Sequence, residues 1–392
     1  MANKISNKHF FACLAYKTIF FFVCYKCYTQ PCLLQNINHA HNDKITIIMK
    51  NLTLKQLCLL AVWLMSCSLV AQDIHYSQFY ADPLRLNPAN TGNFNGDYRF
   101  GANARNQWQA VAVPYNALSG YTDWAFLRNT RSNTPAWLGA GVRLLADQAG
   151  DGRLSTYEIQ TTIGGHKALT PNLYASIGGG VTWVQKQIDF GQLYFNNQWN
   201  EIAFDGTANN QENLIGNRLS YADLQAGGLV SYTQPKRFGV NIGMSVLHVN
   251  QPKISFLDGG ENRLGVRYIA HINSTITANS RLNIEPAAYF TTQKRAAELV
   301  LGSNFAYTLI NSGTAYKPKP MKGYIGLWYR HRDAIVSLVG IELSDYRILL
   351  SYDINISTLR TATQGRGGLE LSLVHVGSFN KLNKSSINCP RF

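Results

Sequence analysis

Residues 346–356 read YRILLSYDINI, and this stretch decides the fold because its side chains alternate in character along the chain. One set of alternate positions is apolar: Tyr346, Ile348, Leu350, Tyr352, Ile354 and Ile356. The other set carries Arg347, Ser351, Asp353 and Asn355, with Leu349 as the exception. Successive side chains of a β-strand point to opposite faces, so the stretch predicts a strand with one apolar and one charged face.

The same alternation returns at residues 173–183, 266–273 and 281–290. Strands of soluble sandwiches usually have about 5–6 residues, whereas the strands expected here run about 10–16, the length that a tilted strand needs to cross a bilayer. The alternation alone fits both architectures, because the polar face meets water in a sandwich and the lumen in a membrane barrel. The strand length, the 32 glycines and the 12% aromatic content favour the barrel.

We therefore predict an all-β fold, a transmembrane antiparallel β-barrel of about 14 strands over residues 98–376. The expected strands begin near Tyr98, Asn116, Ala136, Arg153, Asn172, Leu219, Lys236, Asn262, Arg281, Ala296, Met321, Asp333, Tyr346 and Gly367. Aromatic residues near strand ends, namely Trp183, Tyr324 and Trp328, fit either interfacial girdles or ordinary sheet aromatics.

The connections set the expected orientation. Bacterial barrels with an even number of strands have both termini in the periplasm. Short turns at 170–172, 234–235, 279–280 and 344–345 then fall on the periplasmic side, and the longest connection, 189–218, falls outside. The connection 311–320 is long for its side.

The N-terminal region contains a secretory signal peptide at residues 49–71, with Lys50 and Lys55 before an apolar run that ends at Ala71. Residues 1–48 read as an over-called, unstructured start, so the mature chain is expected to begin near Gln72. The segment removed holds six of the seven cysteines, and its seven lysines and one aspartate reduce the net charge from +14 to +8. The alternative is lipidation of Cys67, since residues 64–67 read LMSC and resemble a lipobox.

The mature chain offers no recognisable catalytic or metal-binding motif. Residues 147–158 have the acids and glycine of a calcium loop, but Ala149 occupies a ligand position and hairpin loops share this composition. The histidines are dispersed, and the inward-facing charged residues are expected to form ion pairs inside the lumen. Since these motifs are missing, we expect no enzyme activity and no cofactor. We also expect no nucleic-acid partner, because the excess positive charge is scattered along the chain and not clustered.

Three motifs near the start of the mature chain are more specific than the strand alternation. Residues 73–80 read DIHYSQFY, residues 83–92 read PLRLNPANTG and residues 105–108 read RNQW. Near the other end, residues 351–359 read SYDINISTL and residues 367–373 read GGLELSL. Together these motifs resemble the PorP/SprF family of type IX secretion system proteins, and the resemblance spans the mature chain.

The resemblance implies a non-catalytic outer-membrane barrel of Bacteroidota that serves protein secretion and gliding motility. Its implied partners are cargo proteins with C-terminal sorting domains, such as adhesins, periplasmic motor-associated components and outer-membrane lipids. The implied docking residues are Ser77, Gln78, Phe79, Pro83, Leu86, Asn87, Pro88, Ala89, Gly92, Asn106, Gln107, Trp108, Tyr352, Asp353 and Glu370.

Residues 72–97 form an expected periplasmic lead-in, and residues 377–392 form an expected periplasmic tail. The lead-in has two interpretations: it docks a partner, or it serves as a plug or latch for its own barrel. Two functions therefore remain open at this point, support for export or surface anchoring of cargo, and a passive outer-membrane diffusion channel.

Overall fold

The computed structural model describes residues 76–107, 114–128, 134–193, 195–199, 201–205, 208, 216–256, 260–310, 320–358 and 360–379. The signal peptide, Trp108 and the tail beyond Phe379 lie outside these residues. Within the described ranges, no helix combines the length and the apolar content needed to cross a membrane.

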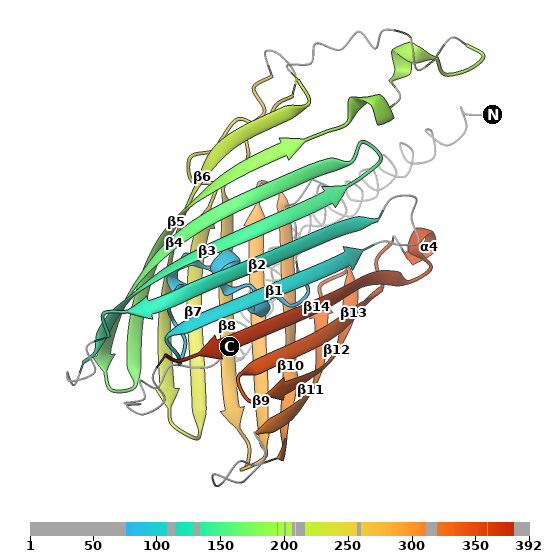
Figure 1. Ribbon diagram of the computed structural model, residues 1–392. Helices are drawn as coiled ribbons and strands as arrows, with labels where there is room; N and C mark the ends of the chain where they lie inside the picture. The colour runs from blue at the N-terminus through green and yellow to red at the C-terminus, as the bar shows by residue number, and fades with distance from the viewer. Residues whose placement is uncertain are drawn as a thin grey trace, which may run out of the picture. The chain divides into compact units, whose positions relative to one another are not determined.

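Fourteen antiparallel strands close into a barrel in which each strand pairs with its neighbours in sequence and β1 pairs with β14 (Figure 1). The strands are β1 (Tyr98–Gln107), β2 (Tyr115–Phe126), β3 (Ala136–Ala149), β4 (Leu154–Thr170), β5 (Leu173–Gln187), β6 (Arg218–Gln234), β7 (Phe238–Leu247), β8 (Arg267–Thr277), β9 (Leu282–Gln293), β10 (Ala296–Ile310), β11 (Met321–Arg330), β12 (Ala334–Leu343), β13 (Tyr346–Asn355) and β14 (Arg366–Gly377). The predicted fold class and strand number are confirmed.

The largest displacement of a predicted strand start concerns β8, which begins at Arg267 and not near Asn262. The residues before it pair within their own connection, because Lys253 and Arg263 form a β-bridge and Leu264 N donates to Pro252 O at 3.0 Å. These residues are therefore paired within the connection and lie outside the ladder of barrel strands.

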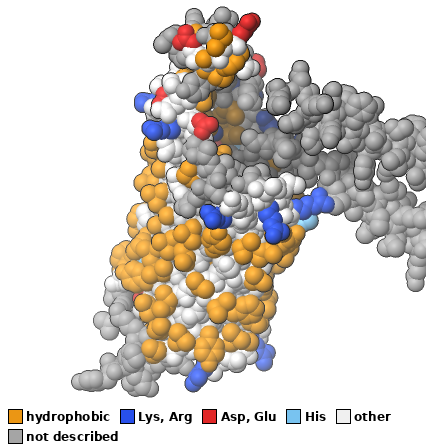
Figure 2. Space-filling view, turned by 90° about the vertical axis from the view of Figure 1, so that its right-hand side faces the viewer, with side chains coloured by type: hydrophobic (Ala, Val, Ile, Leu, Met, Phe, Trp, Pro, Cys, Tyr) orange, Lys and Arg blue, Asp and Glu red, His pale blue; other side chains and the backbone are white. Residues whose placement is uncertain are grey.

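Alternate side chains face outward and inward, as the sequence pattern predicts. The outer wall carries exposed apolar residues, and Figure 2 shows them covering one face of the barrel. Members with large exposed fractions include Leu118, Ile163, Ile177, Met244, Ile325 and Leu327. An outward apolar band with a polar interior is the pattern of a barrel whose wall meets lipid.

The structure decides between the two interpretations of the strand-end aromatic residues. Tyr324 and Trp328 are each 2% exposed and lie inside the barrel, so the interpretation as an interfacial girdle is wrong for these two; Trp183 is outward and 44% exposed. Leu349, the apolar exception on the polar face, points inward as its position in the alternation predicts and packs with Tyr324. The interior accepts these large side chains because another part of the chain fills it.

The connections differ in length at the two edges. The edge where the odd-numbered strands end carries the connections 188–217 and 248–266, and we call it the long-loop edge. The other edge carries the tight connections after β4, β6, β8 and β12, and we call it the short-turn edge. The β2–β3 and β10–β11 connections are the longer exceptions on the short-turn edge.

Residues 76–97, which we call the luminal segment, lie inside the barrel and not outside it (Figure 1, blue). The segment contains η1 (Phe79–Ala81), α3 (Pro83–Leu86) and η2 (Pro88–Asn90). Prolines occupy the first position of α3 and of η2, where the missing N–H costs no hydrogen bond. Asn87 caps η2, since its side-chain oxygen accepts from Ala89 N at 2.9 Å.

Candidate functional site: the luminal segment and the barrel wall

The luminal segment begins in a buried ionic cluster formed by Ser77, Arg105, Arg330, Asp353 and Glu370, which we call the mouth cluster. The Ser77 hydroxyl donates to Asp353 at 2.7 Å and accepts from Arg105 Nη1 at 2.7 Å. Arg105 pairs with Asp353 at 2.7 Å and with Glu370 at 2.9 Å, and Arg330 pairs with Asp353 at 3.2 Å. These side chains are almost fully buried, so each charge depends on its partners to offset the loss of water.

The backbone of the segment completes this cluster. Ser77 N and Gln78 N donate to the two carboxylate oxygens of Glu370 at 2.8 and 3.1 Å. The Gln78 amide donates to Ser351 Oγ at 2.9 Å and accepts from Ser372 Oγ at 2.6 Å. Strands β13 and β14 therefore hold the start of the segment through charge-assisted and neutral hydrogen bonds.

An aromatic cluster follows directly. Phe79 stacks on Tyr289 with ring centroids 5.1 Å apart and meets Trp328 edge-on at 5.7 Å. Tyr80 stacks on Trp328 at 5.2 Å, and Leu86 joins the same buried group. Aromatic pairs at these separations contribute about 0.5–1.5 kcal/mol beyond their area burial. This contact explains why Trp328 faces inward.

The middle of the segment is held by an ion pair across the lumen. Asp82 Oδ2 lies 2.6 Å from Arg143 Nε, and Arg143 also pairs with Glu158 at 3.0 Å. Arg143 and Asp82 are 1% and 2% exposed. Removing one member of such a buried pair costs about 3–5 kcal/mol, because the other charge is left without compensation.

A row of glycines forms the wall opposite η2. Gly139, Gly164, Gly178 and Gly227 are direct cross-strand neighbours on β3 to β6, in register. A Cβ atom added at Gly164 would lie 2.6 Å from Thr91 O, and one added at Gly178 would lie 2.5 Å from Ala89 N. The absence of side chains at these positions lets the backbone of the segment lie directly against the sheet.

Asn87 uses this close approach for hydrogen bonding. Its amide donates to the backbone oxygens of Gly228 and Met244 at 3.0 and 3.1 Å. A Cβ at Gly227 would collide with the Asn87 carboxamide oxygen, so the glycine makes room for this contact. The PLRLNPANTG motif therefore forms a segment that packs closely against the complementary surface of the barrel wall.

The segment ends in a second buried ion pair near the short-turn edge. Arg99 binds Asp123 through two hydrogen bonds, at 3.0 and 2.8 Å, and Gly92 N donates to the same carboxylate at 2.8 Å. Trp137 Nε1 donates to Gly92 O at 2.9 Å. Gly92 has a φ of 76°, in the region that favours glycine, and it turns the chain towards β1.

These contacts show that the segment crosses the lumen lengthwise. Arg105 lies two residues before the end of β1 and Arg330 is the last residue of β11, so the mouth cluster is at the long-loop edge. Trp137 is the second residue of β3, so Gly92 is near the short-turn edge. At that edge Asp97 N donates to Gly377 O at 2.8 Å, and Phe379 N donates to Asp97 Oδ2 at 2.8 Å.

The two ends of the described chain lie at opposite edges of the barrel, because the luminal segment runs through it from one edge to the other. Tyr76 packs against Ala117 and Leu145 near the long-loop edge, whereas Phe379 lies at the short-turn edge. The expectation that both termini are periplasmic stays a prediction, since the residues before Tyr76 and after Phe379 lie outside the described ranges.

The structure brings most of the predicted docking residues into contact with the wall. The residues that meet it or fold within the buried segment are Ser77, Gln78, Phe79, Pro83, Leu86, Asn87, Pro88, Ala89, Gly92, Asp353 and Glu370. Tyr352 is separate, because it is outward and 41% exposed. At the end of β1, Asn106 donates to Asn116 Oδ1, and Gln107 Oε1 accepts from Arg105 at 3.2 Å.

The sequence-based list contained two partners on the wall, Asp353 and Glu370, and missed others. Among those it missed are Arg99, Arg105, Asp123, Arg143, Arg330 and the four glycines of the row. The inward position of these residues could be predicted from strand alternation. The residues of the luminal segment that they contact could not be predicted in this way. Among the described residues, no three His, Cys, Asp or Glu side chains are arranged to hold a metal ion.

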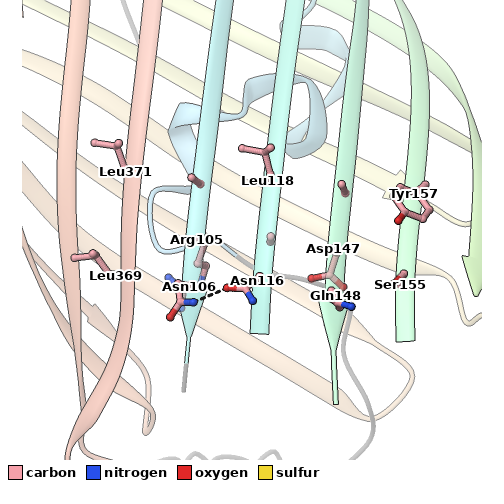
Figure 3. A pocket seen from close by; sticks show the side chains of 13 residues that line it. Arg105, Asn106, Asn116, Leu118, Asp147, Gln148, Ser155, Tyr157, Leu369 and Leu371 are labelled. Carbon is pink, nitrogen blue, oxygen red and sulfur yellow. Dashed lines mark hydrogen bonds between the residues drawn. The ribbon is translucent and has the colours of Figure 1, made fainter. Parts of the chain in front are cut away.

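Two small cavities lie beside the luminal segment. One is lined by Tyr80, Asn241 and Arg347 and the other by Tyr76, Asp82 and Arg267, and each has a volume of about 30 Å³. A larger depression of about 510 Å³ is lined by residues of β14 and β1 to β4 near the long-loop edge (Figure 3). In Figure 3, Leu118 and Leu371 flank it, and the Asn106–Asn116 hydrogen bond lies towards the strand ends.

The chain is similar to one protein family and to several solved structures. A family model described as type IX secretion system membrane protein PorP/SprF matches residues 68–374. No curated protein matches the chain. Among solved structures, the Ralstonia pickettii toluene transporter TbuX is similar over 74% of this chain and 91% of its own, with 11% identity and a TM-score of 0.42.

Two further structures have comparable similarity. The monoaromatic hydrocarbon channel CymD matches over 77% of this chain and 94% of its own, with 10% identity and a TM-score of 0.44. A Pseudomonas aeruginosa FadL homologue matches over 74% and 92%, with 10% identity and a TM-score of 0.41. None of the three is close to this chain in sequence.

Proposed function

Since the chain belongs to the PorP/SprF family of type IX secretion system membrane proteins, we propose that it is a non-catalytic outer-membrane barrel that supports export or surface anchoring of sorting-domain cargo. The observation that carries this proposal is the filled lumen. A barrel whose interior is occupied by its own chain acts through its loops and rims, and not through a pore.

The contacts of the luminal segment support a sealed state. The ion pairs Arg105–Asp353, Arg143–Asp82 and Arg99–Asp123 bind it, or the wall around it, at the start, middle and end of its path. Two cavities beside the segment, one lined by Tyr80 and Arg347 and one by Tyr76 and Arg267, have volumes of only about 30 Å³ each. Opening a channel requires many buried hydrogen bonds to break together.

The long-loop edge is the proposed cargo-binding surface and faces the outside. The connection 188–217 carries exposed apolar side chains at Trp199, Ile202 and Phe204, of which Ile202 is 88% exposed. Trp199 and Phe204 form a β-bridge with ring centroids 5.1 Å apart, so the loop presents them from a defined turn. Exposed apolar groups of this kind mark protein interaction surfaces.

The short-turn edge and the tail after Phe379 then face periplasmic components of the secretion machinery. In this arrangement the barrel links cargo outside with motor-associated components inside, and the wall binds outer-membrane lipid. The same proposal implies that the cargo includes adhesins and that the protein has a role in gliding motility.

Quantitative proteomics of the medium and the cell surface after gene deletion tests the function. Loss of all sorting-domain cargo indicates a core secretion component, and loss of one adhesin indicates a dedicated anchor; complementation with the intact gene is the control. An unchanged surface and medium would refute the proposal.

The second candidate function is a passive diffusion channel, which the charged interior of the barrel favours. Conductance of the purified protein in planar bilayers separates the two. We expect no steady conductance, and steady open pores in the intact protein would favour the channel.

A further inference from the structure

The depression of about 510 Å³ near the long-loop edge lies on the outer face of the wall, because the large side chains that line it belong to the outward set (Figure 3). We propose that it binds an amphipathic lipid, with an acyl chain in its apolar part and uncharged hydrogen-bonding groups of the lipid head against its polar rim. The proposal goes beyond the proposed function and does not depend on it, because the depression lies on the wall in either orientation of the barrel.

A row of four polar side chains borders the depression at the strand ends. Its members share the outward face and are direct cross-strand neighbours on β1 to β4: Asn106, Asn116, Gln148 and Ser155. Each is the second residue from the end of its strand at the long-loop edge. Asn106 Nδ2 donates to Asn116 Oδ1, whereas Asn106 Oδ1 is buried and has no hydrogen-bond partner among the described residues. The row therefore offers donors and acceptors without carrying a charge.

The next outward row, two residues further from the strand ends, is apolar and alternates large and small side chains. From β14 to β4 each member is the direct neighbour of the next, in the order Leu371, Ala104, Leu118, Ala146 and Tyr157. The two alanine positions leave hollows between the three large side chains, and these hollows form the apolar part of the depression. Leu118 and Tyr157 are 59% and 46% exposed, so both are open to contact with a ligand.

The order of the two rows matches an amphipathic molecule that lies along the wall. The apolar row continues the outward apolar band, which meets lipid, and the polar row lies where the strands end. An acyl chain fills the hollows beside Ala104 and Ala146, while ester, amide or hydroxyl groups at its head reach the amides of Asn106 and Gln148. Ligand sites commonly have volumes of about 300–1,000 Å³, so the depression has room for such a chain.

Native mass spectrometry of the full-length barrel tests the site. The protein is released from detergent micelles that contain an uncharged glycolipid, a monoglucosyl diacylglycerol, and the lipid adducts that it retains are counted as the glycolipid concentration rises. Ala146→Leu fills one hollow, and Asn106→Leu removes a hydrogen-bonding side chain of the polar row. The matched controls lie on the outward face beyond the depression: Ala226→Leu on β6, and Gln187→Leu on β5, where the polar row continues.

We expect the unchanged protein to retain one glycolipid per barrel and the variants at 146 and 106 to bind it about tenfold more weakly, while both controls bind it normally. A loss of about tenfold corresponds to lost contact with about two methylene groups of an acyl chain. Added salt should leave the retention unchanged, because the polar row is uncharged. Equal retention by all five proteins, each shown to be folded by heat-dependent gel mobility, would overturn the proposal and leave only the general lipid layer around the wall.

Photocrosslinking identifies the occupant in the membrane. A photoreactive benzoylphenylalanine replaces Leu118, which lies between the two hollows, and is activated in isolated outer membranes. A lipid-sized increase in the mass of the barrel supports the proposal. A protein-sized adduct would overturn it and assign the depression to a protein partner, and the absence of any adduct would also overturn it.

Discussion

The close approach between η2 and the glycine row provides a sharp test of the luminal segment, through two adjacent residues of β5. Gly178 faces inward and Gly179 faces outward. A Cβ at Gly178 would lie 2.5 Å from Ala89 N and would also contact the carbonyl group of Pro88. A Cβ at Gly179 has Gln225 O as its nearest neighbour, at 3.7 Å, which is an ordinary contact distance.

The two alanine substitutions should therefore have opposite effects. Gly178→Ala forces either the segment or the strand to move, because the atoms it meets are backbone, and overpacking of this kind costs about 1–3 kcal/mol. Gly179→Ala adds no clash and restricts the unfolded chain, which stabilises by about 0.4–1 kcal/mol where the backbone geometry permits alanine. We expect the two variants to differ by about 1.5–4 kcal/mol in the free energy of unfolding.

This difference is measured by unfolding the refolded barrel with urea in detergent. Tryptophan fluorescence and heat-dependent gel mobility monitor the unfolding. Planar-bilayer conductance of the same samples shows whether displacement of η2 opens the lumen, and Gly178→Ala should show brief openings that Gly179→Ala lacks. Equal stability and equal conductance of the two variants would show that the segment does not pack against the wall as described.

Three further predictions concern the cluster, the aromatic contact and the loop. Glu370→Gln should lower the free energy of unfolding by about 3–5 kcal/mol, because it leaves the charge of Arg105 with less compensation and weakens two backbone hydrogen bonds. The control Tyr352→Phe, on the lipid face, should shift the urea midpoint little. Equal urea midpoints of these two variants would contradict the role of the mouth cluster. Trp328→Ala should cost about 3–5 kcal/mol in the same assay by removing the platform under Phe79 and Tyr80, and a loss below 1 kcal/mol would contradict that contact. Ile202→Asp should reduce cargo at the cell surface, measured by quantitative proteomics, without changing the urea midpoint, since the side chain is 88% exposed; unchanged cargo would exclude this loop tip from binding.

The strand pattern could be predicted because it is local. Period-two alternation depends on the geometry of each strand alone, so the wall, the number of strands and most strand starts followed from segments such as YRILLSYDINI. The edge carrying the longest connection was also predictable, since connection lengths are read directly from strand boundaries.

The inward aromatics could not be predicted in the same way. Tyr324 and Trp328 have the residue types of a membrane interface, and their inward position is decided by what they contact. That contact is with a segment about 250 residues earlier in the chain, since Trp328 meets Phe79 and Tyr80, and no pattern within β11 refers to it.

The path of the luminal segment was the largest feature that the sequence left open. Its motifs identified the residues that matter, but a docking peptide and a plug have the same local sequence. Only closure of the barrel, which places β1 beside β14, brings Arg105 and Glu370 together around Ser77. The sequence by itself determined the wall, because a strand's two faces are set by neighbouring residues. The tertiary structure decided what fills that wall, because Ser77 and Asp353 are 276 residues apart and meet only when the ring of strands is complete.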